Sequence, residues 1–327
     1  MTATPQPPGR QLRRWAARIG TILVSAAILY YYLRRLDWPG LADAAARADF
    51  GLAAAGIVIP LIGFWVTDAI FTTRSFAWFD QPVACTDYFI IKAAAYLLAM
   101  VNVSFATGGV FLYFTRKTGI GFAKQTGLMA WRLSMAVFGF VLALAGLIAA
   151  VLLFAPGLAA EMRLAALGPA IALILLLMIE IAAFCFYRRG LILRRLPLKL
   201  DSDLFAAFLA ARPRHWGLAF AYTVPPIVLY FVGMYLVARA FHLQVPFFYF
   251  LLRMPLAALV AGLPVAFGGF GTTTAAWHAF FKSYGSEADI AAVTLFIPAL
   301  RLATRALIGF LFMPLALREL ERLRRLD

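Results

Sequence analysis

Charged side chains inside apolar segments are the residues of this chain that could do chemistry. Arg301 and Arg305 are four residues apart in one such segment, so they share a face of a helix. Arg132 and Arg253 lie in two other apolar segments. Because a guanidinium fork matches the oxygens of a phosphate group, this excess of arginine predicts a binding site for a substrate with an anionic, phosphate-type headgroup.

Four further ionisable residues lie in or beside the apolar segments, and they are the candidates for ion pairs or for coupling to a proton or ion: Asp68, Lys92, Glu180 and His278. Charged groups at bilayer depth are costly and mark transport pathways. Two other interpretations are open. The acidic residues can be structural partners of arginines, and Lys92 can extend to the membrane interface.

Two Gly-Gly pairs interrupt apolar stretches, in FATGGVFLYF and in VAFGGFGTTT, and each is followed by a helix with an arginine. Broken helices in corresponding positions of two halves are typical of transporter sites. Free backbone N–H groups and a half-helix N-terminus there would add an anion site. The candidate positions are Asn102, Gly108, Gly109, Gly268, Gly269, Gly271, Thr272 and Thr274. The threonines could equally be a simple helix cap.

The composition predicts an all-α integral membrane protein. Hydrophobic residues make up 64% of the 327 residues and charged residues 14%, too few charges to cover a soluble domain. The net charge of +15 is better explained by cytoplasmic loops facing anionic lipid than by nucleic-acid binding. We find no metal-ligand spacing, nucleotide loop or catalytic triad, so we expect no metal and no cofactor.

Apolar runs of spanning length predict a polytopic bundle with about six full spans and two broken or re-entrant hairpins. We expect a disordered basic tail at 1–16, one transmembrane domain at 17–320 and a charged tail at 321–327. The expected full spans are about 18–33, 50–71, 131–154, 164–187, 216–241 and 289–317, and the expected hairpins are 88–114 and 247–282.

Basic loops set the expected orientation. If 88–114 is a hairpin that opens to the cytoplasm, the basic segments 116–124 and 188–214 and both termini are cytoplasmic. The halves, about 50–154 and 216–317, are then inverted repeats in a bacterial-type inner (cytoplasmic) membrane. The alternative for 88–114 is one spanning helix that ends at a glycine cap.

The segment GLPVAFGGFGTTTAAW, with the later helix FIPALRLATRALIGFL, resembles the lysylphosphatidylglycerol synthase transmembrane family, also called flippase-like. The matching residues are Pro264, Gly268, Gly269, Gly271 and Arg301, and the resemblance extends over roughly 15–320. Thr274 stands where the family usually has Glu, and no acidic residue follows Gly109. We see no aminoacyl-transferase domain in this sequence.

Together these features predict a flippase-like membrane lipid transporter that moves or binds a lipid with a phosphate-type headgroup. The alternative is an integral-membrane enzyme, or an accessory subunit, of lipid or polyprenyl-sugar biosynthesis. The expected partners are membrane lipids, and membrane proteins of a biosynthetic complex are a further candidate. The sequence predicts neither the lipid nor the oligomeric state.

Overall fold

Long apolar helices dominate the computed structural model, which describes residues 34, 37–79, 82–101, 103–154, 203–261 and 270–324. No strand occurs among these residues, and the predicted all-α membrane fold is confirmed. Four described helices are long and apolar enough to cross a bilayer: α3 (Phe50–Trp78), α6 (Phe122–Phe154), α9 (Pro213–Ala240) and α12 (Glu287–Arg324). The predicted spans 18–33 and 164–187 lie outside the described residues.

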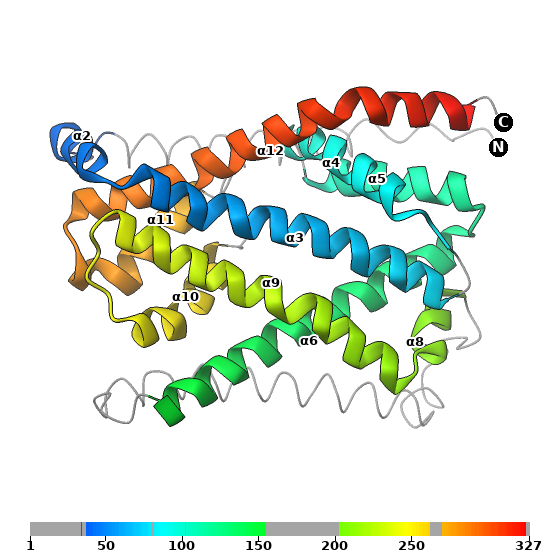
Figure 1. Cartoon of the computed structure of the whole chain (residues 1–327), viewed down its shortest axis with the longest axis horizontal. Coiled ribbons are helices and arrows are strands. Elements are labelled where there is room, and N and C mark those ends of the chain that lie inside the picture. Colours follow the sequence, from blue (N-terminus) through cyan, green and yellow to red (C-terminus); the bar gives the residue numbers. More distant parts are fainter. Residues whose placement is uncertain are drawn as a thin grey trace, which may run out of the picture.

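Helices α3 and α9 run antiparallel in direct contact (Figure 1). At one end, the backbone N–H of Asp49 donates to the carbonyl oxygen of Ala240 over 3.0 Å. At the other end, the indole of Trp78 stacks on the ring of His215 with centroids 5.1 Å apart. Between these ends Gly56 faces Gly233, and a Cβ on either would collide with the other's carbonyl oxygen. Glycine at both positions therefore permits contact between the two backbones.

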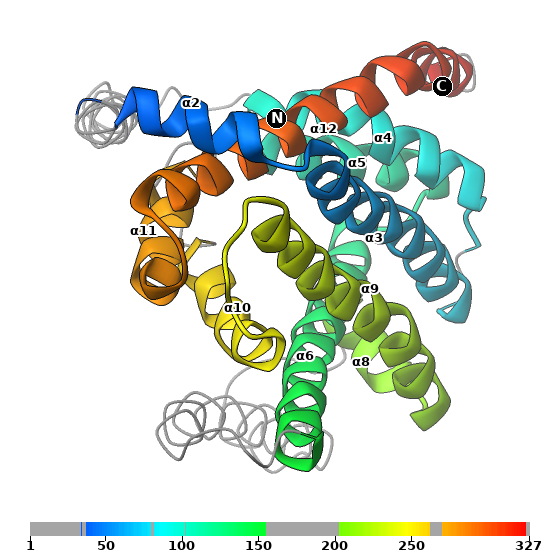
Figure 2. The same cartoon turned by 60° about the vertical axis from the view of Figure 1, so that its left-hand side comes forward.

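Two pairs of shorter helices lie at opposite ends of the bundle (Figure 1). The first pair is α4 (Cys85–Val101) with α5 (Val103–Thr118), and the second is α10 (Phe247–Ala261) with α11 (Phe270–Phe281). Helix α4 packs along α12, whereas α10 packs on α9 and α11 on the start of α12. Figure 2 shows α9 between α3, α6 and α10. Each half thus has a long helix, a helix pair and a second long helix.

The first Gly-Gly pair does not break a helix, contrary to the sequence-based expectation. Gly108 and Gly109 lie inside α5, and the interruption falls between Val101 and Val103. Both glycines are exposed, and no side chain crowds them within 3.4 Å. The helix continues because its own hydrogen bonds satisfy the backbone, and two glycines only weaken that preference. The second pair, 268–269, lies outside the described residues.

Short helices complete the described fold. Helix α2 (Trp38–Arg47) precedes α3, and the side chain of Asp37 caps its start by accepting from Gly40 N–H over 3.2 Å. Before α9, the 3₁₀ helix η1 (Asp203–Phe205) and α8 (Ala206–Ala210) pack on α6. A further short element, η3 (Lys282–Tyr284), joins α11 to α12.

Candidate functional site

A cavity of about 470 Å³, here called the central cavity, lies among α3, α4, α6, α9 and α12. Its lining has two kinds of side chain. The polar residues are Asp68, Lys92, Tyr96, Tyr230, Arg301 and Arg305. The apolar residues are Ile57, Leu61, Phe64, Phe140, Ile227, Phe231 and Met234. These positions lie in the interior of their helices, so the cavity is remote from both ends of the bundle.

Both predicted arginines of α12 line the central cavity. Their four-residue spacing puts them on one helix face, as expected. The guanidinium of Arg301 lies 5.8 Å from the ring centroid of Tyr230, and that of Arg305 lies 5.8 Å from that of Tyr96. Neither arginine forms an ion pair with a described residue, and the buried Nε of Arg305 has no hydrogen-bond partner among them. Their charges therefore face the cavity without a protein counter-ion in the described chain.

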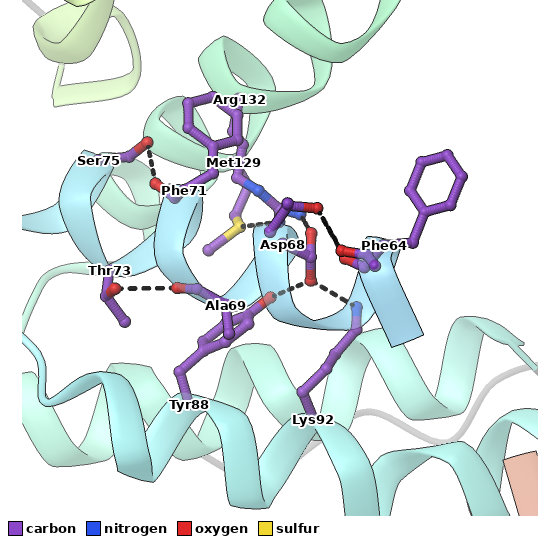
Figure 3. A network of polar contacts seen from close by, with 12 residues as sticks. Phe64, Asp68, Ala69, Phe71, Thr73, Ser75, Tyr88, Lys92, Met129 and Arg132 are labelled. Atoms are coloured by element: carbon purple, nitrogen blue, oxygen red, sulfur yellow. Dashed lines mark hydrogen bonds and ion pairs between the residues drawn. The ribbon is translucent and has the colours of Figure 1, made fainter. Parts of the chain in front are cut away.

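Asp68 is the centre of a polar network that joins three helices (Figure 3). Its Oδ1 accepts from the Nη2 of Arg132 on α6. Its Oδ2 accepts from the hydroxyl of Tyr88 over 3.2 Å and lies 3.5 Å from the Nζ of Lys92, both on α4. The side chains of Asp68 and Arg132 are 21% and 22% exposed, so this ion pair is largely shielded from solvent. The network fixes α3 against α4 and α6 beside the cavity.

The charges around the central cavity do not balance. Among the described residues of its lining, Lys92, Arg301 and Arg305 carry three positive charges, and Asp68 is the single carboxylate. Arg132 does not line the cavity but already binds Asp68. Cationic side chains gathered in a cleft with low-dielectric walls focus their field and attract an anion.

Comparison with known proteins places the chain in a family. Residues 18–309 match the lysylphosphatidylglycerol synthase TM region. This range includes all of α3, α4, α6 and α9 and the greater part of α12, the helices that line the cavity. The chain belongs to this family. No curated protein matches the sequence closely enough to add to that finding. The family connects the chain with membrane lipids and with lipid biosynthesis or translocation.

Other predicted site residues lie away from the cavity of this family member. Arg253 on α10 stacks on the ring of Tyr249, 4.2 Å from its centroid. His278 on α11 is 3.6 Å from a carboxylate oxygen of Glu287, and its side chain is 47% exposed. Thr274 is buried in α11. Gly108 and Gly109 do not line the cavity either. The structure therefore groups Asp68, Lys92, Arg132, Arg301 and Arg305, and separates them from Arg253, His278, Thr274, Gly108 and Gly109.

Four predicted site positions are not among the described residues, and two others lie at the start of α11. Asn102, Glu180, Gly268 and Gly269 lie outside them. Gly271 and Thr272 belong to the first turn of α11. Within the described part of the chain, no group of three or more His, Cys, Asp or Glu side chains could hold a metal ion.

Two tyrosines of the cavity were not predicted from the sequence. Tyr96 follows Lys92 by four residues, so both belong to one face of α4. That spacing is a signal that could have identified Tyr96. Tyr230 has no such signal, because it reaches the cavity through the packing of α9 on α3.

Proposed function

We propose that this chain binds a membrane lipid with an anionic, phosphate-type headgroup in the central cavity and moves it across the membrane. The observation that carries the proposal is the lining itself, which combines three cationic side chains with seven apolar ones. A lipid has the same two parts. Arginine forks suit phosphate oxygens, and the apolar lining suits the start of the acyl chains.

The positions of the cations support a headgroup site within the membrane. Arg301 and Arg305 lie in the interior of the 38-residue helix α12, and Lys92 lies in the middle of α4. A charged side chain at such depth is costly unless it has a partner or serves a ligand. Lys92 shares the carboxylate of Asp68 with Arg132, while the two arginines of α12 are left to their aromatic neighbours in the described chain. A bound phosphate would supply the missing counter-charge.

Two inverted repeats, about 50–154 and 216–317, would provide the movement. Several described features support this arrangement: α3 and α9 run antiparallel, and the α4–α5 and α10–α11 pairs lie at opposite ends of the bundle (Figure 1). The central cavity takes side chains from both halves. Rocking of one half against the other would open the cavity to each side in turn. In this mechanism the helix pairs are re-entrant hairpins.

The distribution of basic residues supports an orientation in the cytoplasmic membrane. Arg116, Lys117 and Lys124 lie where α5 ends and α6 begins, and Arg212 and Arg214 lie where α9 begins. These helix ends are on the same side of the bundle as the end of α12 (Figure 1). Because basic segments are retained in the cytoplasm, this side and the chain termini would be cytoplasmic.

A transport assay in proteoliposomes tests the proposal. We expect Arg301→Ala to reduce the transfer of a fluorescent anionic phospholipid between leaflets by at least about tenfold, the loss typical of removing a desolvated charge contact. The matched control is Arg322→Ala on the same helix, because Arg322 is 75% exposed and forms an ion pair with Glu319 away from the cavity. Full transfer by Arg301→Ala would contradict the proposal. A covalently changed lipid, detected by mass spectrometry, would favour an enzyme instead.

A further inference from the structure

We infer that the central cavity selects a dianionic headgroup, a terminal phosphate or diphosphate on a lipid, over the monoanionic phosphodiester of common phospholipids. This inference rests on the proposed lipid-binding function and specifies its substrate class. It follows from the way in which the charges around the cavity are already paired.

The carboxylate of Asp68 cannot neutralise the cavity. Its Oδ1 is bound by Arg132, a residue outside the lining. The negative charge of the Asp68 carboxylate is therefore offset by the positive charge of Arg132, which does not line the cavity. Lys92 lies 3.5 Å from the other oxygen but has to share it with the hydroxyl of Tyr88. Three positive charges of the lining remain in excess once Arg132 is counted against Asp68.

Arg301 and Arg305 lie on one helix face and repel each other. Each is placed over a tyrosine ring, at 5.8 Å from the centroid. An aromatic face attracts a cation but carries no net charge, so it does not remove the repulsion. A ligand with one negative charge would leave most of the excess in place. A ligand with two or three would balance it.

The excess positive charge of the lining matches the negative charge of a phosphate monoester. A phosphate monoester carries a charge of about −1.5 to −2 at neutral pH, has a second pKa of about 6, and presents three strong acceptor oxygens. A phosphodiester carries one charge and has two free oxygens. Two guanidinium forks and one ammonium group therefore fit the monoester or a diphosphate better. The apolar lining, which includes Ile227, Phe231 and Met234, favours a lipid over free phosphate.

Binding of fluorescent phosphatidic acid and phosphatidylglycerol to the purified full-length chain in detergent micelles tests the inference. At pH 8 we expect phosphatidic acid to bind about tenfold more tightly, the effect of one more charge near a shielded cationic site. At pH 5 the monoester loses its second charge, so the preference should fall to less than about threefold. Asp68, Lys92, Arg301, Arg305 and the neighbouring tyrosines face both lipids alike, so phosphatidylglycerol controls for their titration.

A variant and a competitor complete the test. Arg305→Gln should lower the preference for phosphatidic acid at pH 8, whereas Arg322→Ala should keep it. Inorganic phosphate should displace phosphatidic acid only at far higher concentration, and displacement at equal concentration would overturn the lipid assignment. Equal binding of the two lipids at pH 8, with both weakened by Arg301→Ala, would overturn the dianion inference and leave the proposed function intact. Binding of both lipids that Arg301→Ala leaves unchanged would overturn the proposed function as well.

Discussion

The carboxylate of Asp68 on α3 binds the guanidinium of Arg132 on α6, two residues that are 64 positions apart in the sequence. Through its second oxygen the same carboxylate contacts Tyr88 and Lys92 on α4. One side chain thus holds three helices together at the edge of the central cavity. It also leaves the arginines of α12 as the cations that are available to a ligand.

The Asp68–Arg132 pair should couple strongly in stability. Removing Asp68 leaves Arg132 shielded and without its carboxylate partner, and removing Arg132 leaves Asp68 with only Lys92 and Tyr88 among the described residues, so Asp68→Ala and Arg132→Ala should each destabilise the protein. In a double-mutant cycle measured by unfolding in mixed micelles, we expect a coupling energy of about 1–3 kcal/mol. The matched cycle on Glu319–Arg322, a pair whose arginine is 75% exposed, should give less than about 1 kcal/mol. Equal coupling in the two cycles would show that the Asp68 network has no special structural role.

Tyr230 should support lipid binding through its ring rather than through its hydroxyl. The face of that ring holds the guanidinium of Arg301, an interaction of about 0.5–2 kcal/mol. Tyr230→Leu should therefore weaken phosphatidic acid binding by about threefold to tenfold, because the arginine loses its aromatic partner. Tyr230→Phe keeps the ring and should bind normally in the same fluorescence assay. A loss of affinity in Tyr230→Phe would instead assign the hydroxyl as a direct ligand contact.

The contact between Gly56 and Gly233 predicts that neither position accepts a methyl group. A Cβ at either residue meets the carbonyl oxygen of the other, so α3 and α9 would have to move apart. We expect Gly56→Ala and Gly233→Ala to lower stability by about 1–3 kcal/mol, as overpacking does. Gly146→Ala in α6 is the control, since no atom lies within 4 Å of its Cβ and alanine favours a helix. Thermal unfolding in detergent that ranks all three variants alike would argue against backbone contact.

The sequence predicted several of the charged residues that lie in or beside the central cavity, but not which arginine pairs with Asp68. Arg301 and Arg305 were predicted from local spacing, which a helix converts directly into a shared face. Asp68 with Arg132, in contrast, joins helices far apart in the chain, and only the packing of α3 against α6 brings them together. The glycine pattern was misleading for the first half. Gly108 and Gly109 can mark a break, but a helix also tolerates them when its backbone bonds are intact.

The long helices were easier to predict than their boundaries. The span expected at 50–71 is Phe50–Trp78, because Arg74 is tolerated one turn from its end. The span expected at 131–154 begins earlier, at Phe122, because Gln125 is buried and hydrogen-bonded to the carbonyl oxygen of Phe111 over 2.9 Å. Hydropathy alone could not find the polar first turn of α6, since a tertiary hydrogen bond stabilises it.

The proposed orientation predicts which engineered cysteines are labelled from each side of the membrane. In a Cys85→Ser/Cys185→Ser background, cysteines at Arg116 and Arg212 should react with an impermeant maleimide only when the cytoplasmic face is open to it. Cysteines at Asp43 and Ser286 should react in intact spheroplasts. The four side chains are exposed and lie at opposite ends of the bundle (Figure 1). Labelling of Arg116 and Asp43 from the same side would contradict the proposed arrangement of the halves.

The most direct test of the central claim is an electron cryomicroscopy map of the protein in nanodiscs that contain phosphatidic acid. The account predicts headgroup density in the central cavity within hydrogen-bond distance of Arg301 or Arg305, and loss of that density in Arg301→Ala/Arg305→Ala. Lipid density confined to the outer surface of the helices, with the cavity free of any headgroup in the unaltered protein, would contradict it.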